Sequence, residues 1–258
     1  MIRCRFLMLI VLSTACGGGP RRAPAPAPAP ASTSASPATL DTLWRRAETA
    51  VRHGKWNDAA KVIERLQLEF PPGDPRIARA HYYLGEAYYA LGRHLEAARE
   101  FRKASDETPN DPIAPEALLR VGDVYADLWR RPELDPTYGQ TALATYQELL
   151  NRYPTVPAAK RAELRINELN ERFAYKAYKS ALFYFRLKAY DSAILYLKDL
   201  VATYPKAAIV PEALVKLVQA YKTLGYREDV QETCGYIRRF HPGTPGAKEV
   251  CPAPPAGA

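Results

Sequence analysis

The 258-residue sequence lacks the alternation of apolar and polar residues, with a period of two, that is typical of β-strands. Its body, from residue 40 onward, instead places apolar residues at spacings of three and four, as on one face of a helix. Long hydrophobic runs are also missing, because the run from Phe6 to Leu12 is far shorter than the roughly 20 residues of a membrane-spanning helix. These absences predict an all-α body.

Motifs of catalysis and metal binding are missing as well. The sequence contains no His-Glu-x-x-His motif and no Gly-x-Ser-x-Gly elbow. The glycines at 17–19 are not followed by the Gly-Lys-Ser/Thr of a phosphate-binding loop. The histidines have no metal-ligand spacing; they are His53, His81, His94 and His241. We therefore expect no enzymatic activity, no catalytic residues, no cofactor and no metal site.

The positive charge of the chain does not form a nucleic-acid-binding pattern. Lys and Arg number 36 against 28 Asp and Glu, which gives a formal net charge of +8. The basic residues are interleaved with acidic ones along helical patterns, and no basic stripe with aromatic residues is present. We interpret them as a solvated surface of mixed charge and expect no nucleic-acid partner.

The N-terminus has the organisation of a secretory signal. Arg3 and Arg5 precede the apolar run, and small residues, Ser13-Thr14-Ala15, lead to Cys16. The small residues before a cysteine resemble a bacterial lipobox, which implies cleavage after residue 15 and acylation of Cys16. The absence of an Asp after the cysteine favours outer-membrane sorting. The alternative is an ordinary signal peptide cut elsewhere, with Cys16 a plain thiol.

Residues 16–39 are predicted to tether the folded body to the membrane. The Ala-Pro alternation from Ala23 to Pro30 favours extended polyproline II, and such a segment cannot bury a core. At the other end, residues 244–258 are predicted to be a flexible, Pro-rich tail. Cys234 and Cys251 could form a disulfide in an oxidising compartment. The alternative, one buried thiol and one tail thiol, stays open.

A repeat runs through the body. The clearest copy, Ala78 to Asp111, matches the tetratricopeptide pattern at its seven characteristic positions. The residues there are Leu84, Gly85, Tyr88, Ala97, Phe101, Ala104 and Pro109. Weaker copies begin at Leu40, Pro115, Ala174 and Pro211, with the second helix of the third copy displaced. Since one helical hairpin cannot bury its apolar face alone, the pattern predicts a solenoid of about five stacked hairpins.

Two features interrupt the regular repeat. Residues 130–136 carry two prolines between the helices of the third copy, which predicts an ordered loop. Residues 158–190 contain no Pro or Gly and have one apolar helical face, which predicts a helix of roughly 45 Å. We expect this long helix to bridge N-terminal repeats 1–3, at 40–157, and C-terminal repeats 4–5, at 158–243.

The first helix of each tetratricopeptide hairpin lines the groove of the solenoid. At the groove positions of the first three copies we single out six candidates for peptide binding. They are Trp44, Tyr82, Glu86, Tyr89, Leu119 and Asp123, among neighbours Asp41, Glu48, Val51, Arg79, Glu116 and Ala126. The alternative is that the aromatic candidates pack between neighbouring helices. Other aromatics occupy packing positions and are assigned to the core: Tyr88, Phe101, Tyr125 and Tyr221.

Several motifs together resemble the BamD family of outer membrane assembly lipoproteins. They are the lipobox cysteine, the five repeats, Arg131-Pro132 and Asp135-Pro136-Thr137 in the insertion, Tyr153-Pro154 before the long helix, and Tyr204-Pro205 followed by Pro211-Glu212-Ala213-Leu214. The longer Ala/Pro-rich tether and the Pro-rich tail depart from the family pattern.

The resemblance implies a lipid-anchored protein on the periplasmic face of the outer membrane. It implies that the C-terminal repeats dock on the periplasmic domain of a BamA-like β-barrel insertase. It also implies that the N-terminal repeats receive the C-terminal signal of unfolded outer-membrane proteins. The alternative function is a periplasmic scaffold that links cell-wall machinery to the outer membrane.

Overall fold

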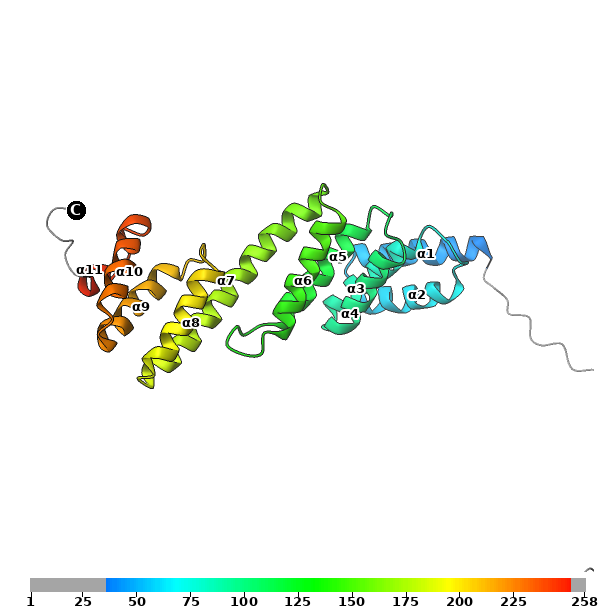
Figure 1. The fold of residues 1–258 in the computed structure, drawn as a ribbon. Helices are drawn as coiled ribbons and strands as arrows, with labels where there is room; N and C mark the ends of the chain where they lie inside the picture. The colour runs from blue at the N-terminus through cyan, green and yellow to red at the C-terminus, as the bar shows by residue number, and fades with distance from the viewer. Residues whose placement is uncertain (1–35, 252–258) are drawn as a thin grey trace, which may run out of the picture. The chain divides into compact units, whose positions relative to one another are not determined.

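The computed structural model describes residues 36–251, which form 11 α-helices and no strand. The helices are α1 (Pro37–Arg52), α2 (Trp56–Glu69), α3 (Ile77–Ala90), α4 (His94–Asp106), α5 (Ala114–Leu128), α6 (Thr137–Arg152), α7 (Pro157–Arg186), α8 (Tyr190–Thr203), α9 (Val210–Leu224), α10 (Arg227–Phe240) and α11 (Ala247–Val250). Each of the first ten packs against its neighbours in sequence, so hairpins follow hairpins along the chain (Figure 1). The predicted all-α solenoid of tetratricopeptide type is confirmed.

Small residues let the two helices of a hairpin approach closely. A Cβ atom added to Gly85 on α3 would lie 2.7 Å from the ring of Phe101 on α4. One added to Gly122 on α5 would lie 2.3 Å from the ring of Tyr146 on α6. Both aromatic rings are fully buried. The repeat pattern therefore places each glycine where only a hydrogen leaves room for the partner ring.

Helix ends follow from local chemistry. Ser36 caps α1, because its side chain accepts a hydrogen bond from the backbone N–H of Thr39 at 3.3 Å. Proline lies in the first turn of α1, α5, α7 and α9, where its missing N–H costs nothing. Gly225 ends α9 with φ of 80°, a left-handed conformation that favours glycine. The first helix begins at Pro37, three residues before the predicted start of the repeats.

The long helix α7 has 30 residues and bridges two cores. Its first half, through Phe173, packs with α5 and α6 around Trp129 and Tyr146. Its second half, from Ala174, packs with α8 and α9. The bridging helix is confirmed, but the cores meet inside it, at residues 173 and 174, rather than in the loop before it. The reason is that residues 158–173 cover the third hairpin, which has no other neighbour on that side.

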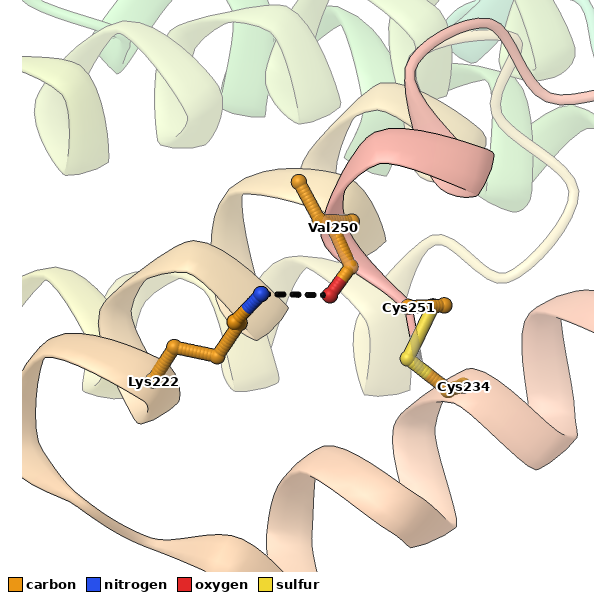
Figure 2. The surroundings of a disulfide bond; sticks show 4 residues. All are labelled: Lys222, Cys234, Val250 and Cys251. Atoms are coloured by element: carbon orange, nitrogen blue, oxygen red, sulfur yellow. Dashed lines mark hydrogen bonds between the residues drawn. A yellow bond between two sulfur atoms is a disulfide. The ribbon is translucent and has the colours of Figure 1, made fainter. Parts of the chain in front are cut away.

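The C-terminal segment is held against the last hairpin, as Figure 2 shows. Cys234 on α10 and Cys251 form a disulfide with Cα atoms 5.6 Å apart. Val250 is buried, and its carbonyl oxygen accepts a hydrogen bond of 3.1 Å from Lys222 Nζ. Residues 244–251 therefore differ from the flexible tail predicted there, because α11 covers apolar surface of α9 that the solenoid would otherwise expose.

The insertion between α5 and α6 is tied to α7. Lys176 Nζ donates hydrogen bonds to the carbonyl oxygens of Glu133 and Leu134, at 3.1 and 2.7 Å. Asp135 accepts from the backbone N–H of Thr137 at 2.8 Å, which starts α6. These contacts agree with an ordered loop.

Within residues 36–251, no helix is both long and apolar enough to cross a bilayer. The predicted signal peptide, Cys16, nearly all of the tether and residues 252–258 lie outside the described residues.

Candidate protein-binding face

The first helices of the second and third hairpins and the start of α7 form a charged face. We call it the first-helix face and define it by Glu86 and Tyr89 on α3, Glu116, Arg120, Asp123 and Asp127 on α5, and Arg161, Arg165, Glu168 and Arg172 on α7. The α5 helix is its centre, since it contacts both α3 and α7.

Ion pairs run across this face from helix to helix. Arg120 Nε donates to Glu86 Oε1 at 2.6 Å, which joins α5 to α3. On the other side, Arg165 Nε lies 3.2 Å from Asp123 Oδ1, which joins α7 to α5. Asp123 Oδ1 also accepts a 2.8 Å hydrogen bond from the hydroxyl of Tyr146. Ion pairs therefore connect three successive helices of this face, α3, α5 and α7.

The two ends of the face carry further pairs. Arg161 on α7 binds both carboxylate oxygens of Glu116 on α5. The Tyr89 hydroxyl donates a short hydrogen bond to Asp127 on α5. Fork-like contacts between Arg and a carboxylate hold geometry as well as charge. The face is thus ordered before any partner binds.

Burial and charge shift the protonation of its groups. Burial raises the pKa of Tyr82 above its ordinary value, and the nearby carboxylates of Glu86 and Glu116 act in the same direction. Burial alone would lower the pKa of Arg120, but its hydrogen bonds to Glu86 raise it above the ordinary value. Both groups therefore keep their usual charge state at neutral pH.

Two cavities open on this face and share part of their walls. One, of about 280 Å³, is lined by residues of α3, α5, α6 and α7. The other, of about 530 Å³, adds the start of α4 and the insertion loop. Their shared lining residues are Tyr89, Ala126, Asp127 and Arg172. We call these two adjoining cavities together the α5 cleft.

The structure brings together half of the predicted candidates. Glu86, Tyr89 and Asp123 lie on the first-helix face, and all three contact Arg120. Arg120 forms ion pairs with Glu86 and Asp123, and its guanidinium lies 4.6 Å from the Tyr89 ring centroid. Tyr82 is partly buried beside them, with its ring 5.4 Å from that of Phe101.

Trp44 and Leu119 have different positions. Trp44 is partly buried and stacks on Tyr83 at 5.9 Å between ring centroids, so it packs between the first and second hairpins. Leu119 is 3% exposed and belongs to the core that α7 completes. The prediction that Leu119 lines a groove is wrong in this respect, because the first half of α7 packs over that position.

Sequence reasoning missed the arginines of the face. Arg120 lies outside the expected groove positions, and the start of α7 was not treated as a groove-lining helix. A signal was present nonetheless, since Arg161, Arg165 and Arg172 are four and seven residues apart and so share one side of a helix.

A second surface lies on the C-terminal hairpins. We call this surface the α7–α8 aromatic patch. It consists of Phe183 and Tyr184 on α7, Leu187 directly after α7, and Tyr196 on α8. Tyr184 stacks on Tyr196 at 5.2 Å between ring centroids. Phe183 and Leu187 remain 50% and 61% exposed. A cluster of large exposed apolar groups is typical of a protein-interaction surface.

A buried polar network ties α2, α3 and α4 together. His81 Nδ1 lies 2.6 Å from Glu100 Oε2, and Gln67 Nε2 lies within 3.2 Å of both side chains. Burial would raise the pKa of Glu100, but hydrogen bonds from His81, Lys103 and Gln67 lower it to about 2. Across the described chain, no group of three or more His, Cys, Asp or Glu could hold a metal ion. The network connects side chains of three helices, α2, α3 and α4.

Comparisons with known proteins place the chain. The family model described as YfiO, outer membrane lipoprotein, matches residues 37–235. The chain belongs to this family. It is 29% identical over 203 residues to the outer membrane protein assembly factor BamD of Vibrio cholerae, covering 74% of this chain and 83% of that protein. The BamD of Caulobacter vibrioides is 24% identical over 204 residues, covering 79% of this chain and 67% of the relative.

Among solved structures, the tetratricopeptide domain of P58(IPK) is similar with a TM-score of 0.44 and 13% identity. It covers 81% of this chain and 53% of that one. The family match spans both groups of hairpins, from α1 into α10. The family and the relatives it includes are not enzymes, and the relatives are named as outer membrane protein assembly factors.

Proposed function

We propose that this protein is a lipid-anchored component of the machinery that assembles β-barrel proteins in the outer membrane. The observation that carries the proposal is the family match over residues 37–235, which includes both the first-helix face and the α7–α8 aromatic patch. Two surfaces of different chemistry on one chain suit a protein with two kinds of partner.

The first-helix face is proposed to receive unfolded barrel proteins as extended segments. Its residues offer aromatic rings beside paired charges, which suits a chain that alternates apolar and polar side chains. Tyr82, Glu86, Tyr89 and Asp123 remain the candidates for this contact, joined by Arg120 and Arg165. Trp44 contributes by packing the first hairpin against the second.

The α7–α8 aromatic patch is proposed to dock the periplasmic domain of the barrel insertase. Its exposed Phe183 and Leu187 provide the apolar centre that stable interfaces require. This surface lies on the second half of α7 and on α8, apart from the residues of the first-helix face, so both partners could bind at once.

Cys16 is proposed to carry the lipid that holds the protein to the periplasmic face of the outer membrane. More than one acyl chain is needed for stable anchoring, and lipoprotein modification would supply them. Replacing Cys16 with Ala should shift the protein from the membrane to the soluble fraction of lysed cells, as measured by immunoblotting. Retention in the membrane fraction would contradict acylation at this residue.

Affinity capture from detergent-solubilised envelopes, with identification by mass spectrometry, tests the assembly role. We expect a large outer-membrane barrel protein with periplasmic domains in near-equal amount. Recovery of cell-wall synthases without such a barrel would overturn the proposal in favour of the scaffold alternative.

A pair of variants locates the docking surface in the same experiment. Phe183→Ser combined with Leu187→Ser should lose the barrel partner. Leu68→Ser on α2 is a matched control, because Leu68 is 88% exposed and lies on an N-terminal hairpin. Equal recovery with both variants would rule out the α7–α8 aromatic patch as the docking site.

A further inference from the structure

A group of exposed basic side chains lies where α1 turns into α2. We call it the α1–α2 basic patch and define it by Arg45, Arg46 and Arg52 on α1 and Lys55 directly before α2. Arg45 and Arg52 are seven residues apart, which is nearly two full turns, so they lie on the same side of α1. A cavity of about 600 Å³, in the size range of ligand pockets, is lined by Arg45, Arg46 and Lys55.

Ion pairs do not neutralise the charges of this patch. Among the residues that the structure describes, no Asp or Glu oxygen lies within ion-pair distance of its four side chains. Arg45 Nε donates to the carbonyl oxygen of Asp41 at 3.4 Å, and Arg52 Nη2 donates to Thr49 Oγ1 at 3.4 Å. The carboxylate of Asp41 is instead engaged by Arg76, at 2.7 Å.

The cavity of the patch is positive on balance. One carboxylate, that of Asp58 on α2, lines it together with two arginines and a lysine, and His53 lies beside them. The Nδ1 of His53 donates to the carbonyl oxygen of Thr49 at 2.7 Å, so the imidazole is held in place at the end of α1. A surface that concentrates positive charge in this way attracts anions.

The chemistry of the patch suits lipid head groups better than a protein. Stable protein interfaces have an apolar centre, and here the apolar residue of the cavity wall, Ala50, is buried. An anionic lipid surface needs no such centre, because each basic side chain near it strengthens binding about fivefold. Trp56, which follows Lys55, is half-buried, and tryptophan is enriched at bilayer interfaces.

The patch also belongs to the hairpin that follows the proposed anchor in the sequence. Cys16 precedes Ser36 by 20 residues, and a chain of that length reaches at most about 70 Å. The 16 residues of α1 add about 24 Å. Anchoring would therefore keep the first hairpin near the membrane, where even a weak contact with lipid is strengthened by a high effective concentration.

From these observations we infer that the α1–α2 basic patch binds the anionic lipid surface of the membrane to which the protein is anchored. Arg45, Arg46 and Lys55 contact lipid phosphates at the cavity, and Arg52 extends the contact along α1. The inference rests on the proposed function for the membrane location alone. Its consequence is that a defined side of the first hairpin faces the bilayer, so the tether does not set the orientation by itself.

Co-sedimentation with lipid vesicles tests the inference. The protein used begins at residue 17, so it cannot be acylated at Cys16 and still contains every described helix. One kind of vesicle is phosphatidylcholine with about one-third phosphatidylglycerol, and the other is phosphatidylcholine alone. We expect binding to the anionic vesicles at low salt, release at high salt, and no binding to the neutral vesicles.

A triple variant and a matched control locate the contact. Arg45→Gln, Arg46→Gln and Lys55→Gln together should weaken binding to the anionic vesicles by more than about tenfold. The control removes the same formal charge from three exposed lysines on the later helices and the loop after α8, and it should weaken binding less than about twofold. It consists of Lys160→Gln, Lys198→Gln and Lys206→Gln. Circular dichroism should show the same helix content and melting for both variants.

Arg52→Gln is a milder variant, which should weaken binding about fivefold and keeps the cavity intact. Equal weakening by the triple variant and its control would overturn the patch, because net charge would then be the cause. Absence of binding to anionic vesicles, or equal binding to both kinds, would overturn it as well. The proposed function is tested separately by Cys16→Ala and by affinity capture, since the vesicle experiment needs neither acylation nor a barrel partner.

Discussion

The N-terminal and C-terminal groups of hairpins both have apolar cores, but different contacts are added to those cores. Between α1 and the first half of α7, ion pairs such as Arg120 with Glu86 and Arg165 with Asp123 connect successive first helices. From Ala174 onward, the helices pack around a third apolar cluster, and the disulfide between Cys234 and Cys251 adds a covalent link. Hairpins of the same kind therefore carry two different surfaces. The first-helix face is charged and held by ion pairs, and the α7–α8 aromatic patch is apolar and exposed.

This difference has a functional consequence. The more exposed ion pairs of the face, such as Arg161 with Glu116, can exchange partners with a passing chain, because such a pair costs little to open in water. An apolar patch binds a partner because binding removes apolar surface from water, and exchanging that partner for another gives no further stabilisation. A transient substrate on the N-terminal hairpins and a lasting partner on the C-terminal ones would fit these properties.

The largest expected effect comes from removing the disulfide. Replacing Cys234 and Cys251 by Ala, or reducing them, should lower the free energy of unfolding by about 3 kcal/mol, since the bond closes a loop of 17 residues. Hydrogen exchange should accelerate in α9–α11 and stay unchanged in α1–α6. Reductant should have no effect on the double variant. Unchanged exchange in α9–α11 would contradict the role of the bond.

A glycine substitution should destabilise the N-terminal group by about 2 kcal/mol, within the usual range for overpacking. Gly122→Ala places a Cβ 2.3 Å from the ring of Tyr146, which is fully buried and has no room to move. Gly235→Ala on α10 is the control, because nothing lies within 4 Å of an added Cβ there. That change should be neutral or stabilising. Chemical denaturation measures both, and equal effects would refute the close-approach argument.

Acid should weaken the N-terminal group through Glu100. Its pKa is about 2 in the folded protein against an ordinary 4.5. The stabilisation is therefore complete above pH 4.5 and is lost as the pH falls toward 2. Glu100→Gln should cost about 1–2 kcal/mol at pH 7 and flatten the loss of stability below pH 4.5. A variant with the same acid dependence as the unchanged protein would show that other carboxylates dominate.

The smallest effect is expected for the exposed pair of Arg161 and Glu116. A double-mutant cycle with Arg161→Gln and Glu116→Gln should give a coupling below about 1 kcal/mol that shrinks with added salt. Thermal melting at two salt concentrations measures it. A larger, salt-independent coupling would mean that this pair holds the helices together and does not exchange partners.

Much of the fold could be predicted because the repeat pattern reflects which side chains pack together within one hairpin. The spacing between Gly85 and Phe101 within one hairpin implies their contact, which the structure has. The candidate site was only partly predictable. The template placed Glu86, Tyr89 and Asp123 correctly on one face, but it treated the third hairpin as the end of the groove, so Leu119 was misplaced and Arg172 was overlooked.

The helices, their pairing into hairpins and the long helix could be read from the sequence, because they depend on spacings within one repeat of about 35 residues. Tertiary structure decided three things: that α7 completes the third hairpin, that Arg172 is left without a carboxylate, and that Cys251 reaches Cys234. Each depends on how one hairpin lies against another. Contacts between hairpins arise from the shape of packed side chains, and the repeat pattern does not encode that shape.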